Sequence, residues 1–131
     1  MSEKQNVICV DLDGTLAEYD EWKGHDHIGA PISSIVHLLH VLRERGWIIK
    51  IFTCRLNGVN TKGRGGLSTR NREPIEKWLN EFNIPYDEIT MSREGKPFAH
   101  VYLDDRAVNP HDFANNTQIL AVCEKLGKHG E

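Results

Sequence analysis

The sequence lacks the features of membrane and exported proteins. Its 131 residues contain no apolar stretch long enough to cross a bilayer, and the polar start MSEKQN lacks the apolar core of a signal peptide. The three cysteines are odd in number and form no CxxC pair. We therefore expect a cytoplasmic protein whose cysteines are small buried thiols in a reducing compartment.

A large excess of charge of one sign is also missing. The formal net charge is −3, and this value gives no global signature of nucleic-acid binding, although a local basic patch stays open. With 39% hydrophobic and 27% charged residues, the composition is that of a globular protein. The length suits a single domain, residues 1–131, with a full hydrophobic core.

Apolar runs and helical spacing alternate along the chain. Nearly continuous apolar runs predict buried strands at residues 6–12, 47–54, 87–91 and 99–103. Apolar residues at helical spacing predict helices at 32–45, 75–82 and 117–126. Pro74 is expected in the first turn of the second helix, and Asn116 and Gly127 are expected to cap and to end the last helix. This alternation predicts an α/β fold, a Rossmann-like three-layer sandwich with a mainly parallel sheet.

Polar residues end three of the predicted strands. Asp11, Thr53 and Asp104 each fall at the C-terminal end of one strand. In a parallel sheet these ends share one edge, where ligands bind. Carboxylates gathered there repel each other, and Mg²⁺ relieves the repulsion by binding one or two carboxylates, water and substrate phosphate. The pattern predicts a magnesium site for a phosphorylated ligand.

Two aspartates spaced two residues apart fit the two parts of phosphoryl transfer. Asp11 can attack phosphorus and form an aspartyl-phosphate. Asp13 can protonate the leaving oxygen and then deprotonate water. A hydroxyl and a lysine would bind the phosphoryl oxygens, and Thr53 and Lys96 are the candidates.

Four segments resemble, in the right order, the motifs of the haloacid dehalogenase (HAD) superfamily. DLDGTL is similar to the DxDGT motif, and IIKIFTCR to the strand that ends in Thr or Ser. GKPFAHVYLDD resembles both the lysine motif and the acidic pair that follows an apolar strand. The resemblance implies a HAD-like hydrolase fold, and an aspartate at position 13 is typical of its phosphatase and phosphotransferase branches.

The resemblance also implies a role for each matched residue. Asp11 matches the nucleophile, and Asp13 matches the general acid-base, whose backbone carbonyl also binds Mg²⁺. Thr53 and Lys96 match the phosphate-binding pair. Asp104 matches the magnesium-binding acid, and whether it or the adjacent Asp105 binds the ion directly is left open.

Further likeness narrows the family. TCR and LDDRA are similar to segments in the phosphatase domain of phage polynucleotide kinase, and small phosphatase-like proteins of bacteria and phages share the GKPxAxxYLDDRA arrangement. The first likeness implies that Arg55 is a further phosphate ligand and that Arg106 is a neighbour of the site. A structural ion pair is the alternative for Arg106.

Two irregular stretches follow the first two predicted strands. Residues 14–30 form a short flap where many HAD phosphatases carry a large cap domain, so we expect a capless protein whose open site suits a bulky substrate or a homo-oligomer. Residues 57–72 are glycine-rich and contain no acid, which favours either a basic flap over an anionic ligand or a solvated loop. The basic residues of this stretch are Lys62, Arg64, Arg70 and Arg72.

Three hypotheses for function follow. The first is a magnesium-dependent phosphomonoester hydrolase that acts on a phosphorylated small molecule. The second is a nucleic-acid end (3′-phosphate) phosphatase or a nucleotidase, motivated by the basic stretch and the open site. The third is a non-catalytic HAD-like protein that binds phosphate. None of them includes a membrane partner.

Overall fold

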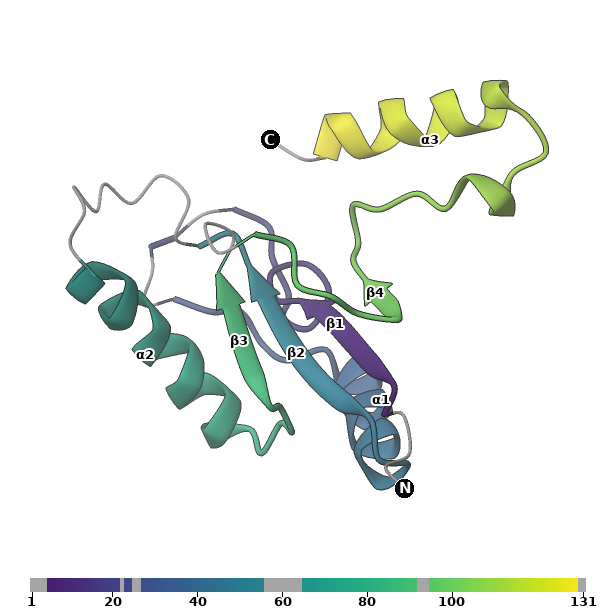
Figure 1. Ribbon diagram of the computed structural model, residues 1–131. Helices are drawn as coiled ribbons and strands as arrows, with labels where there is room; N and C mark the ends of the chain where they lie inside the picture. Colours follow the sequence, from purple (N-terminus) through teal and green to yellow (C-terminus); the bar gives the residue numbers. More distant parts are fainter. Residues whose placement is uncertain (1–4, 22, 25–26, 56–64, 92–94, 130–131) are drawn as a thin grey trace.

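A four-stranded parallel sheet forms the centre of the molecule (Figure 1). The computed structural model describes residues 5–21, 23–24, 27–55, 65–91 and 95–129, and it does not describe the side chains of residues 65–71, 91 and 128–129. The strands are β1 (Val7–Asp11), β2 (Ile48–Thr53), β3 (Glu88–Met91) and β4 (Val101–Leu103). Their order is β3-β2-β1-β4, and every pairing is parallel. The predicted α/β class is therefore confirmed.

Two helices cover one face of this sheet. They are α1 (Ser33–Glu44) and α2 (Gly65–Glu81). The core beneath them contains residues from three strands and both helices: Ile8, Val10, Ile49, Ile51, Ile89, Leu39, Ile75, Trp78 and Leu79. Alternate residues of β1 and β2 point into this core, because successive side chains of a strand face opposite sides. No described segment forms a large cap domain over the sheet.

The third helix lies apart from the sheet. Figure 1 shows α3 (Asn116–His129) at the end of an arm that leaves β4 and contains a short 3₁₀ turn, Pro110–Asp112. None of the described side chains of α3 is buried, and Leu120 is 59% exposed. The other sheet face carries a smaller cluster, in which Val7, Cys9 and Ala99 are buried.

Several helix boundaries differ from those predicted. Residues 65–72 were expected to be irregular, but α2 begins at Gly65 and Pro74 lies inside it rather than in its first turn. Apolar spacing gave no signal there, because this first half of the helix contains few apolar residues. Asn115 rather than Asn116 caps α3, since its Oδ1 accepts the Gln118 N–H at 3.1 Å. The helix also continues past Gly127, so the predicted stop is wrong.

The cysteines are less buried than expected. Cys9 lies inside β1 and is buried, and burial raises the pKa of its thiol to about 11. Cys54 and Cys123 are exposed, so the expectation of buried thiols is wrong for both. Cys54 follows the end of β2, and Cys123 lies on the uncovered helix α3. No described helix is both long enough and apolar enough to cross a membrane.

Candidate active site

Three aspartates from two neighbouring strands meet at the carboxyl edge of the sheet. Asp11 ends β1, and Asp104 and Asp105 follow β4, which pairs with β1 in parallel. One carboxylate oxygen of each lies within 4.8 Å of the others. The sequence therefore predicted correctly that distant segments deliver acids to one place.

The electrostatics of Asp11 show how closely these acids are gathered. Burial, followed by the charges of Asp104, Asp105 and Asp13, raises the pKa of Asp11 from 3.8 to about 8. Every one of these causes disfavours the ionised form. A cation bound between the acids would reverse this effect, because it favours the carboxylate over the acid.

A tight turn after β1 holds the acids together. Gly14 has a φ of +94°, and a side chain at this position would collide with the Asp105 carboxylate. Thr15 is buried, and its Oγ1 accepts the Asp105 N–H at 2.9 Å. The same hydroxyl lies 3.4 Å from Asp11 Oδ2 and 3.3 Å from Asp105 Oδ1. Thr15 thus links the end of β1 to the residues that follow β4.

We expect Thr15→Val to loosen this link at nearly constant volume. The Asp105 N–H would lose its acceptor, and the free energy of unfolding should fall by about 1–2 kcal/mol in urea denaturation. The affinity of the acid cluster for a divalent cation, measured by calorimetry, should fall about 10-fold because the acids lose their positioning partner. Thr90→Val is the matched control, since Thr90 is also a buried threonine, but its hydroxyl donates to Glu88 and, among the described residues, contacts none of the clustered acids. Equal cation affinities in both variants would contradict this role of Thr15.

Asp13 is held by a buried arginine. Arg55 Nε donates to Asp13 Oδ2 at 2.8 Å, and Nη2 donates to Oδ1 at 2.8 Å, which makes a two-pronged pair. The Arg55 side chain is only 3% exposed, and that of Asp13 is 19% exposed. The same guanidinium donates to the carbonyls of Gly24 and His27 at 3.3 and 2.7 Å. Arg55 therefore ties the flap to Asp13.

The base of the flap is closed by the backbone. The Glu18 N–H donates to the Ala30 carbonyl, and the Ile32 N–H donates to the Leu16 carbonyl, both at 2.8 Å. Gly29 passes so close to the Glu18 carbonyl that a side chain would not fit there. The described part of residues 18–30 consequently forms a loop that is fixed at its base and by Arg55.

The remaining predicted residues differ in their contacts. Thr53 ends β2, is 1% exposed, and accepts the Arg55 N–H through Oγ1 at 3.0 Å. Lys96 lies over the Tyr102 ring, with Nζ 4.2 Å from the ring centroid. The Arg106 N–H donates to Asp104 Oδ1 at 2.8 Å, and no ion pair between described residues involves the Arg106 side chain.

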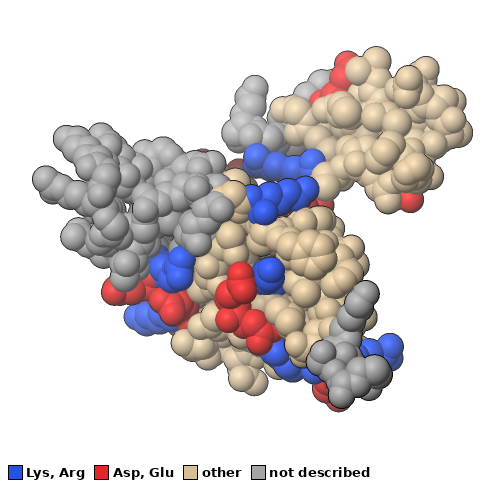
Figure 2. Space-filling view, viewed as in Figure 1, with Lys and Arg blue, Asp and Glu red and all other residues tan. Residues whose placement is uncertain are grey.

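An open pocket of about 260 Å³, here called the acidic pocket, is bordered by Asp11, Asp13, Asp104, Arg55 and Arg106, but its lining does not include Thr53, Lys96 or Asp105. Its lining combines three acids with two arginines, an arrangement that can bind a metal ion and an anion together. Figure 2 shows Lys and Arg side chains gathered between the carboxyl ends of the strands and α3. The lining residues are Asp11, Asp13, Tyr19, Phe52, Cys54, Arg55, Asp104 and Arg106.

Sequence reasoning missed two features of this site. Arg55 was assigned to phosphate, but in the structure its described partners are Asp13 and flap carbonyls. Tyr19 was not singled out, because only its place in the flap pointed to the site. The basic residues 62 and 64 lie outside the described residues, as do the side chains of Arg70 and the other residues of 65–71.

The chain is similar to several proteins of solved structure. A Vibrio cholerae protein with a crystal structure is 30% identical at a TM-score of 0.59, over 92% of this chain and 98% of that one. A chain of the Pnkp1/Rnl/Hen1 RNA repair complex is 25% identical at a TM-score of 0.56, over 78% of this chain. A conserved Bacteroides thetaiotaomicron protein is 20% identical at a TM-score of 0.51, which concerns the fold alone. It covers 93% of this chain and 92% of its own.

Coverage differs between these proteins. The Vibrio cholerae protein matches along nearly its whole length, whereas this chain spans 36% of its neighbour in the RNA repair complex. No protein-family model and no curated protein sequence matches the chain.

Proposed function

The chain belongs to the same family as the Vibrio cholerae protein, and we propose that it is a magnesium-dependent phosphomonoester hydrolase. The observation that carries the proposal is the cluster of Asp11, Asp104 and Asp105 at the carboxyl edge of the sheet, with Asp13 lining the same pocket. The resemblance of four segments to the HAD motifs supports the same reaction.

The acid cluster fits a hard divalent cation. Its donors are all carboxylate oxygens, which suit Mg²⁺ better than a softer transition metal. Burial and the neighbouring carboxylates raise the pKa of Asp11, and a bound cation would favour its ionised form. Asp11, Asp104 and Asp105 would hold the ion, together with the Asp13 backbone carbonyl. The bound ion would neutralise charge on the phosphoryl group and on Asp11.

In the first step a carboxylate oxygen of Asp11 attacks the phosphorus atom. A new oxygen–phosphorus bond forms, and the bond from phosphorus to the leaving oxygen breaks. Asp13 gives its proton to that leaving oxygen. The products of this step are an aspartyl-phosphate on Asp11 and the free alcohol.

In the second step water attacks the phosphorus of the aspartyl-phosphate. Asp13 takes the proton from this water, and the bond between phosphorus and the Asp11 oxygen breaks. Inorganic phosphate leaves, and both aspartates return to their starting forms. Arg55 donates to both Asp13 oxygens in the structure, so one of these hydrogen bonds must open for Asp13 to carry the proton that it transfers, while the other keeps the group oriented.

Phosphoryl oxygens would bind to Thr53, Lys96 and Arg106. The Thr53 hydroxyl already accepts one hydrogen bond and can donate its own proton to phosphate. Lys96 would exchange the Tyr102 ring for a phosphoryl oxygen. These cations and the hydroxyl would offset charge that develops on the oxygens in the transition state.

A second candidate is a phosphatase that acts on a nucleic-acid end. The 25% identity to a chain of an RNA repair complex favours it, as do the basic residues between 57 and 72. It predicts hydrolysis of a 3′-phosphorylated oligonucleotide, with a rate that falls steeply as the salt concentration rises. Activity confined to small metabolites would contradict it.

Removal of magnesium should abolish turnover without unfolding the protein. We expect phosphate release from an aryl phosphate to stop in excess EDTA and to return when Mg²⁺ is added in excess of the chelator. Circular dichroism should remain unchanged, because the hydrophobic core consists of apolar side chains that bind no ion. Mass spectrometry of acid-quenched enzyme should find the phosphoryl group on the peptide that contains Asp11. Full activity in EDTA, or phosphate on another residue, would contradict the proposal.

A further inference from the structure

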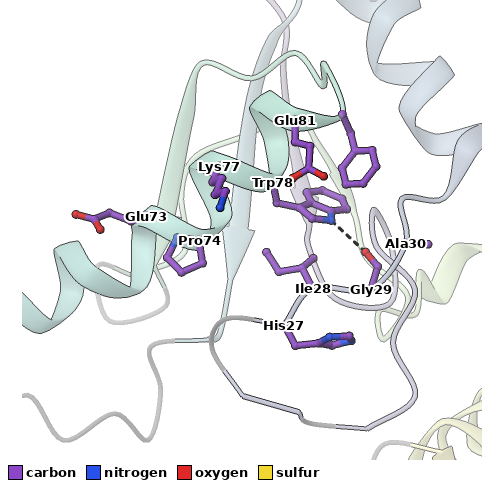
Figure 3. A pocket seen from close by; sticks show the side chains of 10 residues that line it. His27, Ile28, Gly29, Ala30, Glu73, Pro74, Lys77, Trp78 and Glu81 are labelled. Carbon is purple, nitrogen blue, oxygen red and sulfur yellow. Dashed lines mark hydrogen bonds between the residues drawn. The ribbon is translucent and has the colours of Figure 1, made fainter.

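The flap is held in place by hydrogen bonds on two sides. Trp78 Nε1 on α2 donates to the Gly29 carbonyl at 3.1 Å (Figure 3), and Arg55 donates to flap carbonyls and to Asp13. The pocket of about 650 Å³ between Trp78 and the flap shares no lining residue with the acidic pocket. Arg55 does line the acidic pocket, but it is committed to Asp13 and the flap and cannot also neutralise the acid cluster.

A lysine lies on the sheet face that no helix covers. Cys9 on β1 pairs with Tyr102 on β4, so their side chains share this face, and Lys96 Nζ lies 4.2 Å from the centroid of the Tyr102 ring. Asp11 follows Cys9 by two residues in β1, which places it on the same face about 7 Å further along the strand. Phe52, the register partner of Asp11, packs against the cluster of this face and confirms the placement.

The Lys96 ammonium is close to the acid cluster without touching it. Burial is the main cause of the raised pKa of the Cys9 thiol, but Lys96 lowers this pKa while Asp11 and Asp104 raise it, so all three charges act on one thiol. The flexible four-carbon stem of a lysine lets its ammonium rotate over such a distance. No ion pair between described residues involves Lys96. The ammonium thus lies on an aromatic ring although carboxylates are within its reach.

The segment that carries Lys96 is anchored to the sheet through its backbone. The Tyr102 hydroxyl donates to the Pro97 carbonyl at 2.8 Å, and Lys50 Nζ donates to the Phe98 carbonyl at 2.9 Å. Tyr102 therefore acts twice, because its hydroxyl fixes the segment and its ring attracts the ammonium. The ring is 40% exposed, so this attraction is weak enough for a charged partner to replace it.

We propose that Tyr102 is a positioning residue that keeps the Lys96 ammonium off the acid cluster until a phosphoryl group enters the acidic pocket; this inference rests on the proposed function. Three carboxylates within 4.8 Å of one another attract an ammonium within reach, and an ammonium among them would take the place of the divalent cation. While the ring holds Lys96, the cluster stays open to that cation. A phosphoryl group then draws Lys96 from the ring, because a charge-assisted hydrogen bond is stronger than the contact with the ring.

Magnesium binding tests this role of Tyr102 without turnover. Tyr102→Leu removes the ring, so Lys96 should pair with the acids, and the affinity for Mg²⁺ in calorimetry should fall about 10-fold. Adding Lys96→Met to Tyr102→Leu removes the competing ammonium and should restore the affinity to at least the wild-type value. Tyr102→Phe, which keeps the ring, should bind Mg²⁺ like the wild type.

Phe98→Leu is the matched control, since it removes an exposed ring of the same segment that packs against His100, and it should leave the affinity unchanged. Three results would each overturn the inference: an unchanged affinity in Tyr102→Leu, a low affinity that persists in the double variant, or a wild type that binds no Mg²⁺.

Nuclear magnetic resonance locates the ammonium directly. Protons above the face of an aromatic ring resonate upfield, so the Lys96 methylene next to the nitrogen, assigned with Lys96→Met, should be shifted upfield in the wild type and not in Tyr102→Leu. Inorganic phosphate added with Mg²⁺ should remove the upfield shift in the wild type. A signal at the ordinary lysine position, or one that phosphate leaves upfield, would overturn the inference. A protein that gives the expected magnesium affinities and shifts but hydrolyses no phosphomonoester would retain this role of Tyr102 and refute the proposed function.

Discussion

Asp11→Asn is expected to abolish turnover and to stabilise the metal-free protein. The variant lacks the proposed nucleophile, so no aspartyl-phosphate can form. It also lacks a carboxyl whose pKa in the folded protein, about 8, lies well above the 3.8 of an ordinary aspartate. Between these pH values the folded wild type holds a proton that the unfolded chain has lost. Wild-type stability relative to the variant must therefore fall as the pH rises from about 4 to about 8.

Urea denaturation in EDTA at pH 5 and pH 8 measures this difference. We expect Asp11→Asn to raise the free energy of unfolding above that of the wild type at both pH values. The difference should be larger at pH 8, where it should reach about 3 kcal/mol. Asp20→Asn is the matched control, because Asp20 is an exposed carboxyl whose pKa is lowered by the Glu21 N–H and by Lys23. With Mg²⁺ added, the wild type should gain more stability than Asp11→Asn. Retained turnover in Asp11→Asn would exclude the proposed nucleophile.

The sequence predicted the sheet well because its strands are defined by local signals. Continuous apolar runs mark β1 and β2, and two-residue alternation decides which of their side chains face the helices. The start of α2 and the end of α3 were harder to predict from the sequence. Pro74 and Gly127 are unfavourable inside helices, but the rest of each helix outweighs them.

The site was predictable where chemistry and topology coincide. Asp11 and Asp104 end neighbouring parallel strands, and that arrangement brings them together in any fold of this type. The partner of Arg55 was not predictable, because its pairing with Asp13 depends on the path of the flap. No local pattern encodes a contact between residues 42 positions apart.

Arg55→Ala is expected to be among the most destabilising substitutions in the chain. It would leave the Asp13 carboxylate and the carbonyls of Gly24 and His27 without their shared donor in a nearly closed environment. Loss of one partner of a buried ion pair typically lowers the free energy of unfolding by about 3–5 kcal/mol. Arg43→Ala is the matched control, since it breaks a surface pair with Asp87 at 3.0 Å and should have an effect of about 1 kcal/mol or less.

Arg55→Lys separates the structural role from the role in the flap. Lysine keeps the charge but cannot make a two-pronged bond to Asp13 while also reaching both carbonyls. We expect this variant to fold, to lose about 100-fold in kcat because Asp13 is misplaced, and to show faster tryptic cleavage after Lys23 in the flap. Lys23 is an exposed target in the wild type as well, so the rate of cleavage reports flap opening rather than access alone. Unchanged cleavage together with unchanged kcat would show that Arg55 does not couple the flap to Asp13.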